Sequence, residues 1–513
     1  MRKWWPLVAI CLGTFMLLVD VTIVNVALPD MSRSLHASMA SLQWIVDAYA
    51  LTLAALLLTA GAAADLLGRR RVYLAGLAVF ALASLMCALA ADGGVLIAGR
   101  ALQGTGGAVM FATTTALLTS VYEGRDRGIA FSVWGAVSSS AAAVGPTLGG
   151  VLTESWGWPS IFLVNLPVAV VTMVLARRVL PEFKATAGRR LDAVGALSFT
   201  VAAGATVAGL IESAHSGWGS PTVVTLLVVG AMALAVFVVT ESTVAQPMLN
   251  LRLFRRPAFT ALMLAAVLLQ GAAFAHLGYT SMWLQTSLEM GPLAAGLVLT
   301  PLSLSALLVA AFAGRVLHGL PARIPVSAGL VLIGVGVLTE TFIGPGSNWT
   351  VLLAGMVLSG IGAGVVTAPL VSAALSSVPP ADAGTASGAV NTFRQLGQAI
   401  GVAVLGTVFV SEAAHTLAGK NVPGVPQETA SALGGGQGRQ IIESVAPARR
   451  AALTEALDAA FAHGLQQVFL IAGSAAVAVG VAAWFLMGRL GRDTHVPAQT
   501  AATAPPAPAG TRS

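Results

Sequence analysis

Charged side chains are scarce in this chain. Asp, Glu, Lys and Arg make up 9% of its 513 residues, whereas 56% of the residues are hydrophobic. A soluble protein of ordinary composition carries about 25% charged residues. The mean hydropathy of +0.84 therefore argues against a water-soluble core. Serial apolar stretches of roughly 20 residues predict membrane-spanning helices instead.

Cysteine is also rare, and so is any clustering of metal ligands. Cys11 and Cys87 lie in apolar stretches, where they are expected to be apolar filler. The seven histidines are scattered without metal-ligand spacing. The chain contains no Gly-x-x-x-x-Gly-Lys-Ser/Thr loop. These absences argue against a membrane enzyme, a metal centre, a bound cofactor and a self-contained ATP-driven pump. A sensor would need a sizeable soluble domain, which the sequence does not offer.

The apolar stretches predict an all-α integral membrane protein with fourteen transmembrane helices. A long external loop is expected at 411–464, with a short amphipathic helix at 443–463. The Ala-, Pro- and Thr-rich residues 491–513 predict a disordered tail. The predicted spans are 6–29, 43–64, 72–91, 94–119, 128–153, 160–180, 192–211, 221–240, 258–284, 293–317, 324–343, 349–375, 384–410 and 465–487.

The placement of Lys and Arg predicts the orientation. If the N-terminus is cytoplasmic, most of the 27 basic residues fall in cytoplasmic loops. The first apolar stretch is too long to be a cleaved signal. We therefore expect a multi-pass protein of the cell membrane with both termini in the cytoplasm. The basic balance then reflects loops that face anionic lipid rather than a nucleic-acid partner.

An internal repeat predicts two halves. Residues 104–109 (Gly-Thr-Gly-Gly-Ala-Val) resemble residues 360–365 (Gly-Ile-Gly-Ala-Gly-Val), at an offset of 256 residues that also pairs Gly145 with Gly401. Parallel halves around a central substrate site are one transporter architecture. The predicted organisation is a six-helix bundle at 1–186, a two-helix insert with its linker at 187–250, a second six-helix bundle at 251–490 and the tail at 491–513.

Four motifs resemble those of the major facilitator superfamily, and specifically its fourteen-span drug:proton antiporter branch. They are the span 1 sequence at 19–29, the loop at 61–71, the span 4 sequence at 100–104 and the Gly145-Pro146 element. The alanine-rich sequence as a whole is similar to the sequences of antibiotic exporters of high-GC bacteria. The resemblance implies a major-facilitator-type fold and proton-driven export.

The loop after span 2 is expected either to be a conformational latch or only to set the orientation through its positive charges. Gly61 and Gly68 allow a tight reversal of the chain, and Asp65 is expected to accept from a helix N-terminus across the two halves. Arg69 belongs to the same motif. The equivalent loop in the second half, at Arg315, lacks the acidic residue, which predicts a weaker latch there.

The span 5 element is interpreted either as the antiporter kink or as a plain packing kink. Gly145, Pro146, Gly149 and Gly150 combine a missing backbone donor with surfaces that a neighbouring helix can approach closely. The second half has Val402 where span 5 has the proline. Any kink is therefore expected in the first half only.

Four residues are candidates for proton coupling. Asp20 lies about 14 residues into span 1, roughly 21 Å from its inner end, where an ionisable group is by default a functional hypothesis. The alternative is a hydrogen-bonded aspartate that fixes helix packing. Asp47 and Arg100 lie at similar depths and are expected to form a charge cluster with Asp20, either functional or static. His276 is expected either to titrate near neutral pH or to be a packing residue. Glu340 is expected either to contact a cation or to lie at the membrane–water interface.

Polar residues inside the spans predict the substrate site. These are Asn25, Gln103, Gln270, Asn391 and Arg394. The alternative for Gln270 is packing against lipid or another helix, and for Arg394 it is snorkelling or capping of a backbone group. The function expected is proton-coupled export of small amphipathic or cationic drugs by a monomer in the lipid bilayer, driven by the proton gradient. The alternatives are an exporter or importer of a specific metabolite or siderophore and, remotely, a membrane enzyme or sensor.

Overall fold

The computed structural model is helical throughout its described part. It describes residues 2–35, 39–183, 192–244, 247–317, 320–378, 383–420, 426–434, 438–443 and 445–488, and it contains no strand within them. The helices are α1 (Trp5–Leu35), α2 (Met39–Leu67), α3 (Arg69–Ala88), α4 (Gly93–Val121), α5 (Gly124–Trp156), α6 (Ser160–Leu163), α7 (Asn165–Val179), α8 (Ala193–Ser216), α9 (Pro221–Thr243), α10 (Pro257–Ala273), α11 (Leu277–Thr286), α12 (Pro292–Val316), α13 (Arg323–Thr339), α14 (Leu353–Ser376), α15 (Ala383–Gly419), α16 (Pro426–Gly434), α17 (Gly438–Glu443) and α18 (Pro447–Gly488). Short 3₁₀ turns are η1 (Arg2–Trp4), η2 (Leu251–Arg255), η3 (Glu340–Phe342) and η4 (Trp349–Leu352).

The length and the composition of the helices agree with the predicted all-α membrane fold. Thirteen helical segments of the described part are long and apolar enough to cross a membrane. The predicted fifth span, 128–153, is absent from these thirteen although α5 has 33 residues. At about 1.5 Å per residue this helix is long enough to span. Several side chains of α5 lie outside the described part, to which the thirteen segments are confined.

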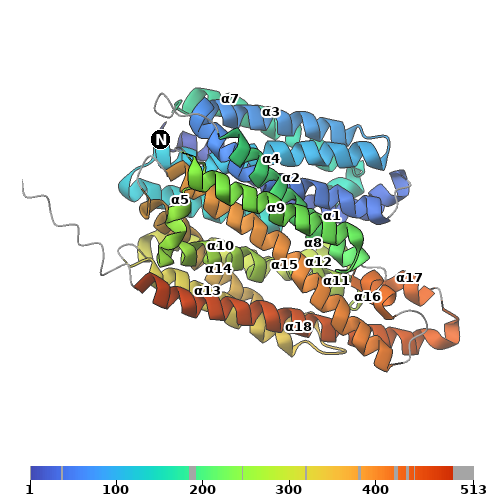
Figure 1. Ribbon diagram of the computed structural model, residues 1–513. Coiled ribbons are helices and arrows are strands. Elements are labelled where there is room, and N and C mark those ends of the chain that lie inside the picture. Colours follow the sequence, from blue (N-terminus) through green and yellow to red (C-terminus); the bar gives the residue numbers. More distant parts are fainter. Residues whose placement is uncertain are drawn as a thin grey trace, which may run out of the picture.

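Two bundles of helices lie side by side. In Figure 1 the helices α1–α4 and α7 occupy the upper part and α10, α13, α14 and α18 the lower part. The first bundle is held by packing of α1 on α5 and of α4 on α2 and α3, and the second by packing of α13 on α14 and α18. The bundles meet where α5 packs on α12 and where α2 packs on α15.

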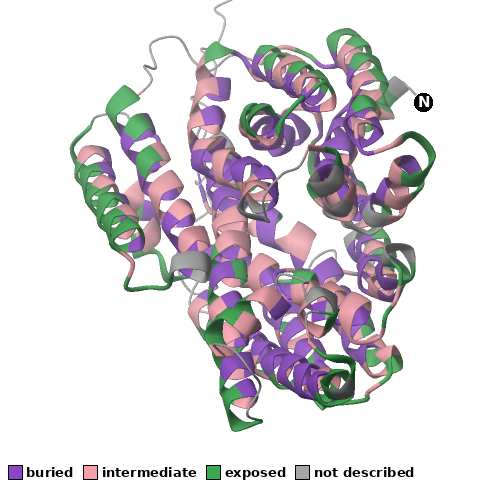
Figure 2. Ribbon diagram, turned by 90° about the vertical axis from the view of Figure 1, so that its right-hand side faces the viewer, coloured by how far each residue is buried: buried purple, intermediate pink, exposed green. Residues whose placement is uncertain are grey.

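The two extra helices cover one side of the contact between the bundles. α8 and α9 pack on each other, and α8 also packs on α2 and α15. The Thr59 hydroxyl of α2 lies 3.1 Å from that of Thr200 of α8. Most of α9 is exposed, as expected for a helix that faces lipid. Figure 2 shows the helices end-on, with buried residues on the inward faces.

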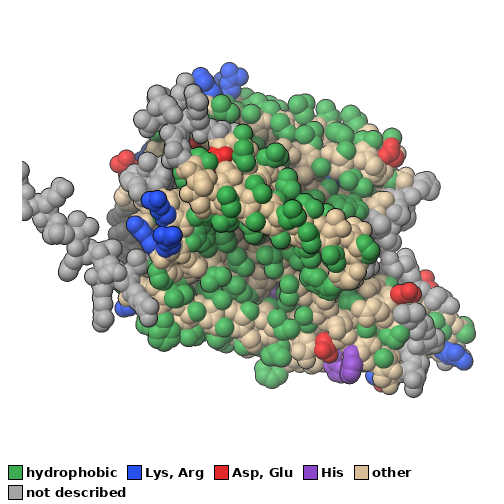
Figure 3. Space-filling view, in the orientation of Figure 1, with side chains coloured by type: hydrophobic (Ala, Val, Ile, Leu, Met, Phe, Trp, Pro, Cys, Tyr) green, Lys and Arg blue, Asp and Glu red, His purple; other side chains and the backbone are tan. Residues whose placement is uncertain are grey.

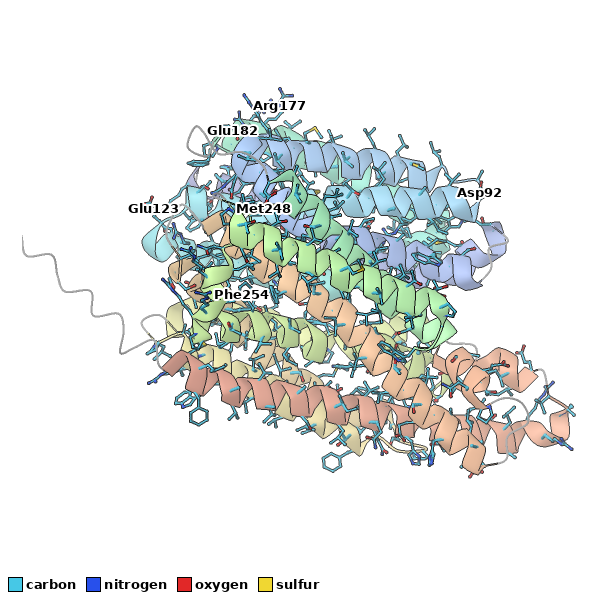
Figure 4. All side chains as sticks on the ribbon, in the orientation of Figure 1. Asp92, Glu123, Arg177, Glu182, Met248 and Phe254 are labelled. Atoms are coloured by element: carbon cyan, nitrogen blue, oxygen red, sulfur yellow. The ribbon has the colours of Figure 1, made fainter. Side chains whose placement is uncertain are left out.

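The ends of the helices follow from local sequence. The Asp92 side chain caps α4 by accepting from the backbone N–H of Val95 at 2.9 Å. Figure 4 places Asp92 at one end of the molecule, and Glu123, Arg177 and Glu182 at the other. The chain therefore crosses the full length of the bundle in α4. Figure 3 shows flanks covered mainly by hydrophobic side chains, with Lys and Arg gathered mostly at the left end.

The segment predicted as an external loop, 411–464, is helical over much of its length. α15 continues to Gly419, and α18 begins at Pro447 and runs for 42 residues. The predicted amphipathic helix at 443–463 is largely the first part of α18 rather than a separate element. Its charges mark the section that projects beyond the apolar part, and no proline interrupts the helix after Pro447. The predicted tail at 491–513 lies outside the described residues.

Candidate functional site

Asp20 lies at the centre of a buried hydrogen-bond cluster. Its carboxylate is 0% exposed and accepts from Arg100 Nη1 at 2.6 Å, Gln103 Nε2 at 2.7 Å and Asn165 Nδ2 at 2.8 Å. Asp20 is on α1, and its partners come from α4 and α7. Hydrogen bonds to a charged group are roughly twice as strong as neutral ones, so the cluster fastens three helices of the first bundle to one another.

Arg100 is fixed on every side. Its side chain is 1% exposed. Its Nε donates to the Ile45 carbonyl at 3.0 Å, and Nη1 also donates to Gln103 Oε1 at 2.7 Å. The guanidinium lies over the ring of Tyr49, 4.3 Å from its centroid, a favourable cation–π contact in a desolvated site. The predicted pairing of Asp20 with Arg100 is present in the structure.

Two members of the cluster escaped the sequence analysis. Ser84 Oγ accepts from Gln103 Nε2 at 2.9 Å and from Asn165 Nδ2 at 3.3 Å. Both Ser84 and Asn165 are uncharged, and single polar residues are common in transmembrane helices. Their only sequence signal was a polar residue in an apolar stretch. Gln103, predicted for the substrate site, is fully buried in this cluster, which corrects its assignment.

Asp47 does not join the cluster, contrary to the prediction. It is half-buried, and no hydrogen bond or ion pair within the described part links it to Arg100. The arginine uses the carbonyl of Ile45 instead. Depth along a helix sets the height of a side chain but not its direction, because successive residues turn by about 100°.

The glycines of α5 press against α1 beside this cluster. A Cβ added to Gly145 would lie 3.2 Å from the Val19 carbonyl, and one added to Gly149 would lie 2.8 Å from that of Ile23. Gly150 is looser, with its nearest neighbour at 4.0 Å. The side chain of Pro146 is outside the described part, and α5 is one continuous helix through this position.

The loop after α2 forms its contacts inside the first bundle. Arg69 donates to Asp65 Oδ1 from Nη2 at 2.9 Å and from Nε at 3.1 Å. Its Nη1 also binds the Ala116 carbonyl and the Ser120 hydroxyl of α4. Within the described residues, Asp65 has no bond to the second bundle, so the expected cross-bundle latch is not present here.

Glycine is required at one position of this loop and gives close approach at another. Gly68 has φ +103°, a conformation that side-chain-bearing residues rarely adopt. Gly61 lies within α2, where an added Cβ would lie 3.9 Å from Ala112 of the first bundle and 4.0 Å from Gly388 of the second. The predicted motif therefore reaches the contact between the bundles at Gly61, whereas Asp65 and Arg69 bind each other inside the first bundle.

Three further predicted substrate residues, Gln270, Asn391 and Arg394, lie on α10 and α15. Arg394 Nη2 donates to Gln270 Oε1 at 3.3 Å, whereas its Nε and Nη1 have no partner among the described residues. Asn391 Nδ2 donates to Thr115 Oγ1 at 3.3 Å, which joins the two bundles. The side chain of Asn25 is outside the described part.

His276 has a partner that the sequence analysis did not assign to it. Its Nδ1 lies 3.9 Å from Glu340 Oε2, and both side chains are 0% exposed. His276 Nδ1 also lies 3.5 Å from the Thr280 hydroxyl. The described part contains no group of three or more His, Cys, Asp or Glu residues placed to hold a metal ion.

A two-bundle array of membrane helices, with ionisable side chains buried inside the spans, defines a membrane transporter. A model of the Major Facilitator Superfamily matches residues 10–402. The chain belongs to this superfamily, which confirms the resemblance drawn from its motifs and establishes a transporter rather than an enzyme.

Curated relatives are resistance and export proteins. The chain is 37% identical to the multidrug resistance protein Stp of Mycobacterium tuberculosis (strain CDC 1551 / Oshkosh) over 80% of this chain and 76% of that protein. It is also 37% identical to the puromycin resistance protein pur8 of Streptomyces alboniger, over 81% and 84%, and to the cephamycin export protein CmcT of Amycolatopsis lactamdurans, over 83% and 87%.

A solved structure supports the fold. The crystal structure of the human organic anion transporter MFSD10 (TETRAN) superposes with a TM-score of 0.62, covering 94% of this chain and 99% of that chain at 17% identity. At this identity the likeness concerns the arrangement of helices alone.

Proposed function

We propose that this protein exports small amphipathic or cationic compounds across the cell membrane in exchange for protons, by alternating access between its two bundles. The relatives named for multidrug resistance, puromycin resistance and cephamycin export support the choice of substrate class. The observation that carries proton exchange is the fully buried Asp20 carboxylate bound to Arg100.

The charge of this cluster changes with one proton. With Asp20 ionised, the carboxylate and the guanidinium compensate each other. When Asp20 binds a proton, the arginine stays charged because its guanidinium does not titrate in proteins. The cluster then holds an uncompensated positive charge away from water, which is costly. A conformation that gives Arg100 another environment is thereby favoured.

Helix contacts can transmit this change to the other bundle. Asp20 is on α1, which packs on the Gly145 and Gly149 face of α5. α5 in turn packs on α12 of the second bundle. A shift of α1 would therefore move a helix that belongs to the contact between bundles. Arg394, Gln270 and Asn391 are the side chains that we assign to the substrate pathway beside that contact.

The experiment uses everted membrane vesicles energised to be acid inside, with a quenched pH dye in the lumen. Ethidium and puromycin are added as probes to vesicles with wild type, Asp20→Asn and Asp92→Asn. Asp92→Asn is the matched control, because Asp92 is exposed and asparagine also caps a helix. We expect substrate-evoked proton efflux in wild type and Asp92→Asn, and a loss of at least 10-fold in Asp20→Asn.

Each outcome decides a different part of the proposal. Efflux that persists in a normally expressed Asp20→Asn protein would remove Asp20 from coupling. Uptake of probe into the vesicles without proton efflux would argue for another driving ion. A response to puromycin but not to ethidium would favour a specific exporter over a multidrug one.

A further inference from the structure

The second bundle contains its own buried ionisable pair. His276 lies at the break between α10 and α11, and Glu340 lies where α13 passes into η3. Both side chains are 0% exposed. In a membrane helix bundle, an ionisable residue removed from water is expensive and is by default a functional hypothesis.

The polar atoms of this pair are poorly satisfied. His276 Nε2 and both carboxylate oxygens of Glu340 have no hydrogen-bond partner within the described part. The ring of Phe469, from α18, lies edge-on to the imidazole with its centroid 5.4 Å away. Gly355 of α14 lies against the Glu340 side chain. A static structural pair would be expected to have its hydrogen bonds filled, because an unmet buried polar group costs free energy.

One proton decides the charge of the pair. With a proton bound, either as O–H on Glu340 or as N–H on His276 Nδ1, the pair has no net charge. When the proton leaves, a carboxylate and a neutral imidazole remain, with a net charge of −1 and no other ionic partner within 4.0 Å among the described residues. Because both side chains are fully buried, the form without net charge, with the proton bound, is favoured in this conformation.

The pair occupies a place that corresponds to the Asp20 cluster of the first bundle. By the repeat offset of 256 residues, His276 follows Asp20 and Glu340 follows Ser84. Glu340 lies against Gly355 of α14, which follows Gly99 of α4 by the same offset. Both residues of the pair therefore stand at repeat positions that belong to the Asp20 cluster in the first bundle.

We propose that His276 and Glu340 form a second exchangeable proton site, so that each bundle carries one proton site of its own. The inference rests on the proposed antiport function and extends it to a second coupled proton. The proton enters from the outer side, binds the pair as described and is released to the cytoplasmic side when the bundles rearrange and water reaches the pair.

The first test does not depend on a substrate. Infrared difference spectra are recorded on the purified full chain between pH steps, for wild type, Glu340→Gln, His276→Gln and Asp20→Asn. We expect a titrating band, either carboxyl or imidazolium, that Glu340→Gln and His276→Gln both remove and Asp20→Asn leaves in place. Spectra in which neither substitution removes a titrating band would overturn the proposal. His276→Gln decides the question alone if Glu340→Gln does not fold.

The second test measures coupling in proteoliposomes as the number of protons moved per ethidium. Glu340→Gln should lower this ratio by about one while ethidium transport continues. Glu241→Gln is the matched control, since Glu241 is also a buried carboxyl within a span but lies on the inserted α9. An unchanged ratio in Glu340→Gln, with a titrating band present, would show a pair that binds a proton without coupling and would overturn the inference. If wild type does not move ethidium at all, the antiport proposal fails for that probe, and the infrared result still decides whether the pair binds a proton.

Discussion

Arg100 Nη1 lies 2.6 Å from Asp20 Oδ2, and together the two side chains are almost completely removed from solvent. The pair joins α4 to α1 at a depth where water does not compensate a single charge. Removing one partner of a buried pair commonly costs about 3–5 kcal/mol, whereas removing both costs much less. The stability of the protein should therefore depend on both residues together.

We expect Arg100→Gln to lower the apparent melting temperature in detergent by several degrees. Asp20→Asn combined with Arg100→Gln should recover most of this loss, because the double variant has no unpaired charge. Thermal unfolding of the two single variants and the double variant checks the predicted stabilities. Arg100→Gln and the double variant should also lack proton-coupled transport. Additive losses in the double variant would show that the two side chains do not act on stability as a pair.

The α1–α5 contact predicts a sharp difference between adjacent glycines. In Gly149→Ala the new methyl group would meet the Ile23 backbone oxygen at 2.8 Å, and a backbone atom cannot move aside as a side chain can. Overpacking of this kind costs typically 1–3 kcal/mol. We expect a lower apparent melting temperature and transport reduced several-fold.

Gly150→Ala is the control for this prediction. Its nearest neighbour would lie 4.0 Å away, which is ordinary van der Waals contact. Stability and transport should stay at wild-type values. Equal losses in both variants would mean that helix flexibility, rather than close approach to α1, is what these glycines provide.

The sequence identified the ionised residues of the site better than their neutral partners. Asp20 and Arg100 stand out because a charge in an apolar stretch has few explanations. Ser84 and Asn165 do not stand out, since neutral polar residues occur throughout such helices. Glu340 and His276 are far apart in the chain, and only the packing of α10, α11 and α13 brings them together.

The sequence does not show in which direction around the helix axis each side chain points. Depth along the spans places Asp20 and Arg100 at one level, as the structure does. The same depth argument also predicts Asp47 in the cluster, but Asp47 forms no hydrogen bond with either residue in the described part. Gln103 was assigned to substrate and instead binds Asp20. The boundaries of α15 and α18 were missed for a different reason, because charged residues end a membrane span without ending a helix.

The turn between α2 and α3 predicts a conformational cost for any side chain at Gly68. Its φ of +103° strains a non-glycine residue, at about 1 kcal/mol or more. We expect Gly68→Ala to reduce the apparent melting temperature. It should also disturb Glu182, whose carboxylate accepts from the Arg70 backbone N–H at 3.2 Å.

Gly128→Ala provides the comparison for Gly68→Ala. Gly128 lies in α5 with nothing within 4 Å of an added Cβ, and alanine favours a helix relative to glycine. Its apparent melting temperature should be equal to or above that of wild type. A tolerated alanine at Gly68 would mean that the loop adopts another backbone conformation in the membrane.

Arg394 predicts how the protein discriminates between charged substrates. Its guanidinium has two nitrogen atoms, Nε and Nη1, without partners among the described residues, and it lies beside Gln270 on the pathway that we assign to substrate. A positive charge there opposes a cationic compound by about 1 kcal/mol or more at short range. Arg394→Gln should therefore lower the KM for ethidium several-fold.

Arg394→Lys is the informative companion, because it keeps the charge and loses the planar group. If charge decides, the lysine variant should keep the wild-type KM for ethidium while the glutamine variant does not, and protons moved per ethidium should be the same in all three. Since Arg394 is far from Asp20 in the chain and shares no hydrogen bond with its cluster in the described part, a changed proton ratio in Arg394→Gln would place this arginine in coupling rather than in substrate selection.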